Sequence, residues 1–206
     1  MIQMKVAVHL FALTLLIAAP ICIAQSYTTN APDGTPGISF AHGCVSSPFF
    51  SFTYNLPDEL TLEDMSHAPN GGNDPTHRAY ALFMASRDRG INRDVVEAAA
   101  EDRRSATDSS AASWMRALHH ANATRNDVPT QDEVETVSVG DQELSRLAFQ
   151  QSRSDGVITY EVAYAFGVKG YVVFFILGSV DHGTLAGLEK SIQSLSFKPD
   201  GCGAAK

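Results

Sequence analysis

Three polar side chains stand close together in the segment GSVDHG: Ser179, Asp181 and His182. These residue types form hydrolytic triads, in which histidine takes the proton of the serine nucleophile and aspartate orients the histidine. Triads are assembled from distant segments, however, and neighbours in sequence seldom adopt that geometry. The nucleophile sequences G-x-S-x-G and S-x-x-K do not occur either. The start of a helix, with Asp181 as its N-cap, explains the same residues better.

The histidines do not form a metal-binding pattern. His119 and His120 are adjacent on a predicted helix, where neighbouring positions point about 100° apart, so they would not share one metal ion. The positions four residues away carry no ligand set; they hold Met115, Arg116, Ala123 and Thr124. An acidic cluster resembles a calcium site only in composition, since its spacing fits no ligand loop; its members are Asp127, Asp132, Glu133 and Glu135. We therefore predict no metal and no cofactor, and assign no catalytic residue.

Arginine is concentrated between Arg78 and Arg104, which suggests an anion-binding face. Aspartate and glutamate are nearly as frequent in the same interval, so a solvated surface of mixed ion pairs is the better interpretation. A phosphate-binding loop, a dinucleotide-binding fingerprint, a haem-attachment motif and an EF-hand loop do not occur in the sequence. The net charge of −8 and the lack of a basic stripe argue against binding of nucleic acid.

The first 24 residues predict a secretory signal peptide. Lys5 supplies a positive start, residues 6–17 are apolar, and Cys22 and Ala24 occupy the −3 and −1 positions. We expect cleavage after Ala24, which leaves Gln25 first, and no transmembrane span in the mature chain. Acylation of Cys22 is the alternative, although Pro20 and Ile21 fit a lipoprotein signal poorly. The protein is accordingly predicted to be secreted or periplasmic.

The mature chain would keep two cysteines, Cys44 and Cys202. Thiols of exported proteins usually pair, so we predict a disulfide between them. A reactive thiol is the other interpretation, but no C-x-x-C motif surrounds Cys44. The two cysteines also mark the ends of the one predicted folded domain, at 44–202. We expect a loose leader at 25–43 before it and a short tail at 203–206 after it.

Strand patterns dominate the rest of the chain. Apolar and polar residues alternate from Phe50 to Tyr54, and a short strand is expected around Leu60–Leu62. The segment 78–86 is apolar on both faces, which indicates a strand covered by layers on both sides. Glycine-bearing turns then separate four further strands in a predicted antiparallel meander; they are expected at 134–140, 142–152, 157–166 and 171–179.

Three helices are predicted between and after these strands. Residues 95–106 are rich in Ala and Glu and follow a cap at Asn92 or Asp94. A second helix should span about 109–122, with an apolar stripe that includes Trp114. The last helix should follow Asp181 and place its leucines on one face up to residue 195.

The order of these elements resembles the PsbP-like and Mog1-like α/β/α sandwich families over most of residues 48–197. The pieces that carry the resemblance are FTYNLP, YVVFFILGS and LEKSIQSLSF. It implies an α+β fold, an antiparallel sheet with helices on both faces. The families share a scaffold and no common active site, so no residue role is implied.

Two functional hypotheses remain open from the sequence. The first is a non-catalytic binding or accessory domain that acts on an envelope or extracellular protein. The second is an exported, hydrolase-like enzyme whose site is assembled from scattered residues, with His77, Arg87 or His182 at one rim. The lack of a catalytic constellation favours the first hypothesis.

Overall fold

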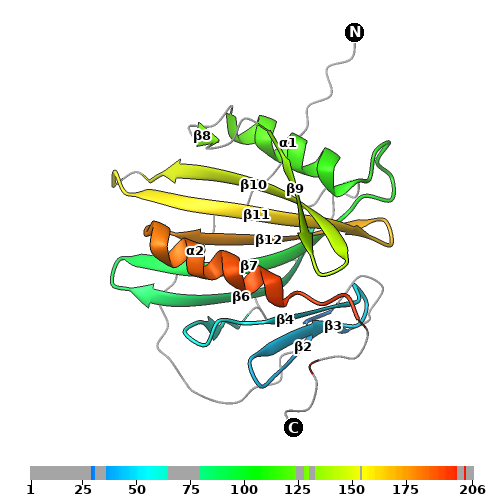
Figure 1. Ribbon diagram of the computed structural model, residues 1–206, viewed down its shortest axis with the longest axis horizontal. Helices are drawn as coiled ribbons and strands as arrows, with labels where there is room; N and C mark the ends of the chain where they lie inside the picture. Colours follow the sequence, from blue (N-terminus) through cyan, green and yellow to red (C-terminus); the bar gives the residue numbers. More distant parts are fainter. Residues whose placement is uncertain are drawn as a thin grey trace.

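The computed structural model describes residues 29–30, 36–64, 79–123, 128–129, 133–153, 155–198 and 202. Its strands form two antiparallel sheets, accompanied by two α-helices (Figure 1). The large sheet has the order β5-β6-β7-β12-β11-β10-β8, with β9 also paired to β10, and the small sheet has the order β1-β2-β3-β4. A mostly antiparallel α+β fold was the class predicted from the sequence, and it is confirmed.

The strands divide unequally between the two sheets. The large sheet contains β5 (Thr61–Leu62), β6 (Ala79–Arg89), β7 (Asn92–Asp102), β8 (Val128–Pro129), β9 (Glu135–Val139), β10 (Gln142–Ser152), β11 (Ile158–Val168) and β12 (Tyr171–Ser179). The small sheet contains β1 (Thr29–Asn30), β2 (Pro36–Ala41), β3 (Cys44–Ser47) and β4 (Phe52–Asn55). The helices are α1 (Ala111–Ala123), α2 (His182–Ser191) and the short 3₁₀ turn η2 (Ile192–Ser194).

Some sequence predictions concern residues outside this description. They are the signal peptide at 1–24 with its alternative lipid site Cys22, the possible rim residue His77, and the tail at 203–206. All of these remain predictions.

The helix predicted for residues 95–106 is wrong, because this segment belongs to strand β7. Its alanines and glutamates favour a helix locally. The strand pairs with β6 along one edge and with β12 along the other, where its partners run from Tyr171↔Asp102 to Gly178↔Val95. Pairing on both edges and burial of alternate residues outweigh the local preference. The preceding segment is a hairpin turn rather than a helix cap, since Arg89 pairs with Asn92 across Gly90, whose φ is +69°.

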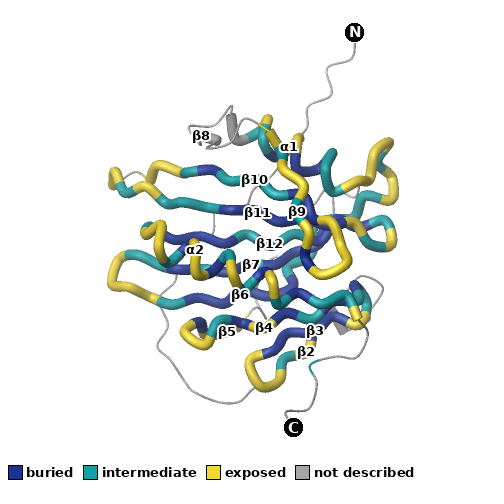
Figure 2. Tube along the Cα trace, viewed as in Figure 1, coloured by how far each residue is buried: buried dark blue, intermediate teal, exposed yellow. Residues whose placement is uncertain are grey.

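Strand β12 runs through the middle of the core, with buried residues on both of its faces. Val173 is fully buried in a core cluster that includes Leu185 of α2, whereas Val172 is fully buried in a second cluster that includes Trp114 of α1. Figure 2 shows buried positions along the central parts of β7, β12 and β11. Alternate residues of one strand thus serve two separate packing clusters.

The other two predicted helices are confirmed, with bounds shifted by a few residues. Helix α1 packs against β10, β11 and β12, and α2 packs against β12, β11 and β7. The predicted N-cap of α2 is also correct, because the backbone N–H of Thr184 donates to Asp181 Oδ1 at 2.7 Å. Further along this helix, Leu185 and Leu188 are buried.

The small sheet differs from the expected loose leader. Residues Pro36–Ala41, predicted as part of a leader at 25–43, form β2 and pair with β3. Strand β4 then places Phe52 and Tyr54 in the core, where the Phe52 ring lies 5.6 Å from Phe175 of β12. Aromatic contacts of this kind attach the small sheet to the large one.

The structure joins Cys44 to Cys202 in the disulfide that the sequence predicted, across a separation of 158 residues. Close to it, Thr53 of β4 and Ser196 exchange two backbone hydrogen bonds of 2.8 and 3.0 Å. The segment after α2 is therefore held beside the small sheet by both covalent and backbone contacts. In the part of the chain that is described, no helix has the length and apolar character needed to cross a bilayer.

Candidate functional site

Three connections meet at one end of the large sheet, at the left of Figure 1. They are the β6–β7 turn (residues 88–93), the β10–β11 turn (151–158, with 154 outside the description) and the junction of β12 with α2 (179–184). The antiparallel register brings them together, because the C-terminal ends of β6, β10 and β12 all lie at this end of the sheet. We call this region the hairpin end.

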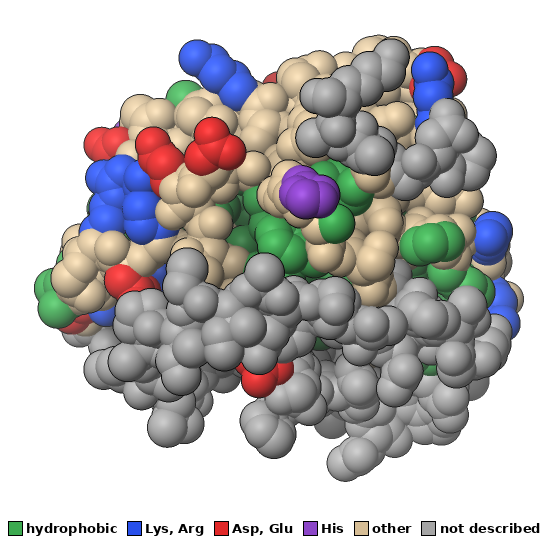
Figure 3. Space-filling model, turned by 90° about the horizontal axis from the view of Figure 1, so that it is seen from below, with side chains coloured by type: hydrophobic (Ala, Val, Ile, Leu, Met, Phe, Trp, Pro, Cys, Tyr) green, Lys and Arg blue, Asp and Glu red, His purple; other side chains and the backbone are tan. Residues whose placement is uncertain are grey.

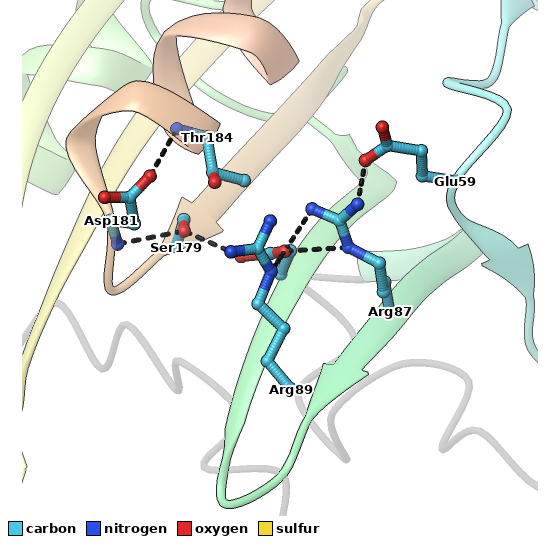
Figure 4. A network of polar contacts seen from close by, with 7 residues as sticks. Glu59, Arg87, Arg89, Ser179, Asp181 and Thr184 are labelled. Carbon is cyan, nitrogen blue, oxygen red and sulfur yellow. Dashed lines mark hydrogen bonds and ion pairs between the residues drawn. The ribbon is translucent and has the colours of Figure 1, made fainter.

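A buried carboxylate lies directly beneath the hairpin end. Asp94 is 0% exposed and receives the Arg87 Nη2 and Arg89 Nε groups at 2.8 and 2.7 Å on one oxygen. Its other oxygen accepts a hydrogen bond of 2.7 Å from Ser179 Oγ. Arg87 also pairs with Glu59, which lies in the loop before β5 (Figure 4). A buried charge is tolerated only when it is paired in this way.

Ser179, Asp181 and His182, for which the sequence favoured a helix start over a triad, each have a structural contact. Ser179 Oγ donates to Asp94 and accepts the backbone N–H of Asp181 at 3.1 Å. The bond from the Thr184 backbone lowers the pKa of the Asp181 carboxyl. The ring of His182 lies 3.7 Å from the ring of Tyr160, centroid to centroid. The arrangement shown in Figure 4 therefore fixes the start of α2 to β7 and β12 rather than preparing a serine for attack.

A second group of charged residues occupies the opposite face of the same hairpin. Glu63 accepts hydrogen bonds from Ser86 Oγ, at 2.5 Å, and from the Arg93 guanidinium, which also lies 3.4 Å from Asp88. Glu97 lies nearby on β7. Burial raises the pKa of its carboxyl above the usual value, and the negative charge of Glu63 raises it further.

A third polar group connects α2 to strands β10 and β11. Arg146 Nη2 contacts Glu189 at 2.8 Å, and the hydroxyl of Tyr164 donates to the same carboxylate at 2.8 Å. Burial and the Glu189 charge raise the pKa of Tyr164 to about 12. Arg146 also pairs with Glu135 of β9 at 3.0 Å. This group ties four elements together: β9, β10, β11 and α2.

Hydrophobic side chains reach the solvent at the hairpin end. Among the described residues, the two large hydrophobic side chains that are exposed are Ile91, at 77%, and Ile158, at 40%. Arg153, on the same turn as Ile158, connects the two turns: its Nη1 donates to the Ile91 carbonyl at 3.4 Å, and its Nη2 pairs with Asp155 at 2.8 Å. Seen from below (Figure 3), basic and acidic side chains lie side by side at the left, the side on which Figure 1 shows the hairpin end.

The remaining sequence candidates are not brought together. His119 and His120 lie on α1, remote in the fold from the residues at 179–184. Arg87, one candidate for an enzymatic rim, is paired with Asp94 and Glu59, and His77 lies outside the description. Within the described ranges, no three His, Cys, Asp or Glu side chains are grouped so as to hold a metal ion.

Sequence reasoning missed Asp94, which it treated as a possible helix cap. The signal that could have revealed it is the segment RDRGINRD, in which basic and acidic residues are spaced symmetrically about a glycine turn. In a two-residue hairpin this spacing sets Arg87 opposite Asp94, and the structure has that register.

Comparison with known proteins adds information about the fold. No protein-family model matches the chain, and no curated protein matches it. Among solved structures, the cyanobacterial PsbP protein (CyanoP) of Synechocystis sp. PCC 6803 superimposes with a TM-score of 0.52 at 14% identity, over 74% of this chain and 90% of that one. LpqN of Mycobacterium tuberculosis, described as involved in cell envelope biogenesis, gives a TM-score of 0.44 at 12% identity, over 69% and 78% of the two chains.

Protein PA94 of Pseudomonas aeruginosa, described as a putative regulator of unknown function, gives 0.40 at 14% identity, over 67% and 96%. At these identities a structural likeness speaks about the scaffold alone. The resemblance noted in the sequence is confirmed at this level, and the chain has a PsbP-like fold.

Proposed function

We propose that the protein is an exported accessory domain that binds another protein of the envelope or extracellular space and catalyses no reaction. The observation that carries the proposal is the exposure of Ile91 and Ile158 at one end of the sheet, on two neighbouring turns that Arg153 connects. The charged side chains around them are paired with one another, as in Arg153–Asp155 and Arg93–Asp88. The hairpin end thus offers aliphatic contacts without a surplus of either charge, which suits a partner protein with an apolar docking surface.

The polar clusters support a non-catalytic role. Catalytic groups need a pKa matched to proton transfer and an approach for the substrate. Asp94, Ser179 and Asp181 instead satisfy one another and the backbone of α2. A PsbP-like scaffold is compatible with many roles, so these side chains support the proposal and the fold alone does not.

Export and architecture form the second part of the proposal. We infer that residues 1–24 are removed as a signal peptide and that residues 44–202 form one domain closed by the Cys44–Cys202 disulfide, a bond typical of exported proteins. We also propose an α/β/α sandwich with α1 and α2 on opposite faces of the large sheet. The neighbouring residues Val172 and Val173 support this, because they pack with α1 and α2 respectively.

The binding proposal can be tested with a double variant of the hairpin end. Ile91→Ser and Ile158→Ser remove the exposed aliphatic groups, and the matched control is Ala186→Ser, at an exposed position on α2. Wild type, double variant and control would be purified from the native envelope, and the copurifying proteins identified by mass spectrometry. Each candidate would then be measured for direct binding to the three purified proteins.

We expect one partner that binds wild type and control with equal affinity and the double variant at least tenfold more weakly, since two interfacial aliphatic side chains contribute on the order of 2–3 kcal/mol. Equal unfolding midpoints of the three proteins would show that folding is not the cause. A partner that binds all three equally would contradict the assignment of the surface, and turnover of a substrate by the pure protein would contradict the non-catalytic role.

A further inference from the structure

Two glutamates lie in one row across the edge of the large sheet. The backbone N–H of Glu63 donates to the Met84 carbonyl at 2.8 Å, which extends the β5–β6 pairing by one residue. Met84 pairs in register with Glu97, and Glu97 pairs with Ile176 of β12. Directly opposed residues point to the same face of a sheet. The Glu63 and Glu97 side chains therefore share a face, with only Met84 between them.

Glu63 links the β5 edge of the large sheet to the two neighbouring strands. Its carboxylate accepts from Ser86 on β6 and from Arg93 on β7, so it connects the segment after β5 to two strands at once. Strand β5 itself contributes only two paired positions, Thr61↔Ser86 and Leu62↔Ala85. Attachment of this edge thus depends strongly on the contacts of one side chain.

Glu97 faces few groups that could neutralise it. The charged groups described on this face are Glu63 beside β5, Asp88 on β6, Arg93 and Glu101 on β7, Arg103 just after β7 and Glu161 on β11. Strand β12 offers only apolar residues there, and Met84 is buried beside Glu97. The cations described on this face are already engaged: Arg93 is shared by Glu63 and Asp88, and Arg103 pairs with Glu101. An ionised Glu97 would consequently meet more negative than positive charge.

We propose that Glu63 and Glu97 form a pH-sensitive contact that controls how firmly the β5 edge is attached to the sheet. A protonated Glu97 leaves Glu63 free to hold Ser86 and Arg93. An ionised Glu97 repels Glu63 and weakens both hydrogen bonds, so the edge opens more often. The direction follows from burial: the folded pKa of Glu97 lies above its unfolded value. The contribution of Glu97 to attachment is then complete below about pH 4.3, the usual glutamate value, and is lost as the pH rises through the folded pKa of Glu97.

Amide hydrogen exchange of the intact protein tests this contact directly, because the Glu63 amide reports the opening of the edge. Protection factors would be measured from pH 4 to pH 8 in wild type and Glu97→Gln, with Glu143→Gln as a control that removes a charge at an exposed position of β10. The Leu56 amide, which donates to the Gly43 carbonyl at 2.8 Å in the small sheet, serves as an internal reference.

The expected result is a loss of Glu63 protection in wild type as the pH rises, by about tenfold for each unit by which the pKa of Glu97 in the attached state exceeds its pKa in the edge-open state. In Glu97→Gln the Glu63 amide should keep full protection throughout, whereas in Glu143→Gln it should lose protection as in wild type. The protection of the Leu56 amide should be the same in all three proteins. In Glu63→Gln, a carbon-13 titration of Glu97 should show a lower midpoint than in wild type. Equal protection of Glu63 in wild type and Glu97→Gln at every pH, or an unchanged Glu97 midpoint in Glu63→Gln, would overturn the proposal.

Discussion

Arg87 and Asp94 face each other across the β6–β7 hairpin, with the arginine Nε and Nη2 atoms 3.1 and 2.8 Å from one carboxylate oxygen. The two side chains differ in burial: 1% of the Asp94 side chain is exposed, against 25% of Arg87. The arginine therefore reaches inward from the surface to a charge that the fold has removed from water. Such a pair is costly to break from the buried side, because the desolvated group loses its partners.

Replacing Asp94 by Asn should destabilise the protein by about 1.5–3 kcal/mol, the range for hydrogen bonds to charged groups. The amide keeps an acceptor for Ser179 but no longer neutralises Arg87 and Arg89. Urea unfolding at pH 7 measures the effect. Asp88→Asn is the matched control: its side chain is 78% exposed on the other face of the hairpin, and we expect a change below about 0.5 kcal/mol. Equal midpoints for the two variants would show that the buried position carries no special cost.

Two glycine turns of the large sheet should respond differently to alanine. Gly170 and Gly90 both have positive φ, +79° and +69°, which costs about 1–2 kcal/mol for a residue with a Cβ. At Gly170 the added Cβ would also lie 2.6 Å from Arg104 Cγ, whereas nothing lies within 4 Å at Gly90. Arg104 packs there because its guanidinium lies 5.0 Å from the centre of the Tyr171 ring.

We therefore expect Gly170→Ala to be more destabilising than Gly90→Ala by about 1–2 kcal/mol, the usual cost of overpacking. Thermal and urea unfolding of the two variants would measure the difference. Identical losses would mean that Arg104 moves aside without cost.

Tyr54 should make the protein sensitive to alkaline pH. Burial raises the pKa of Tyr54 to about 12. Ser191 Oγ donates to the Leu188 carbonyl at 2.6 Å, so the Tyr54 hydroxyl is the donor to Ser191 Oγ. Because the folded pKa exceeds the unfolded value of about 10, the stability linked to this group is present below pH 10 and lost between pH 10 and 12.

The Tyr54→Phe variant removes that titration. Its unfolding free energy should start lower at pH 8 by about 1 kcal/mol for the lost hydrogen bond, but should fall less steeply than wild type between pH 10 and 12. Parallel pH profiles would contradict the expectation. Tyr160→Phe, at a partly buried position on β11, is a suitable control.

Local patterns predicted the helices and strands whose apolar residues repeat with a single helical or strand period and whose ends are marked by a glycine or a capping residue. The apolar run of β12 between glycines, the stripe of α1 around Trp114 and the cap at Asp181 are all visible in short windows of sequence. Strand β7 was mistaken for a helix because its alanines carry no strand signal. Their suitability appears only when Phe83 and Phe175 on the neighbouring strands need small partners between them.

The polar clusters were harder to foresee for a related reason. Asp94 acquires its burial and its partners from β6 and β12, which contribute Arg87 and Ser179 at separations of 7 and 85 residues in the chain. The row that connects Glu63 to Glu97 likewise depends on the register of three strands. Neither the depth of a charge nor the sum of charges around it is encoded in a local window.

The bond between Cys44 and Cys202 turns almost the whole folded chain into a covalent ring. A single proteolytic cut at any loop inside that ring opens it but releases no fragment. The two pieces would migrate together on a non-reducing gel and separate only after reduction. Release of a fragment from the domain by limited proteolysis would accordingly require two cuts, or one cut and a reductant.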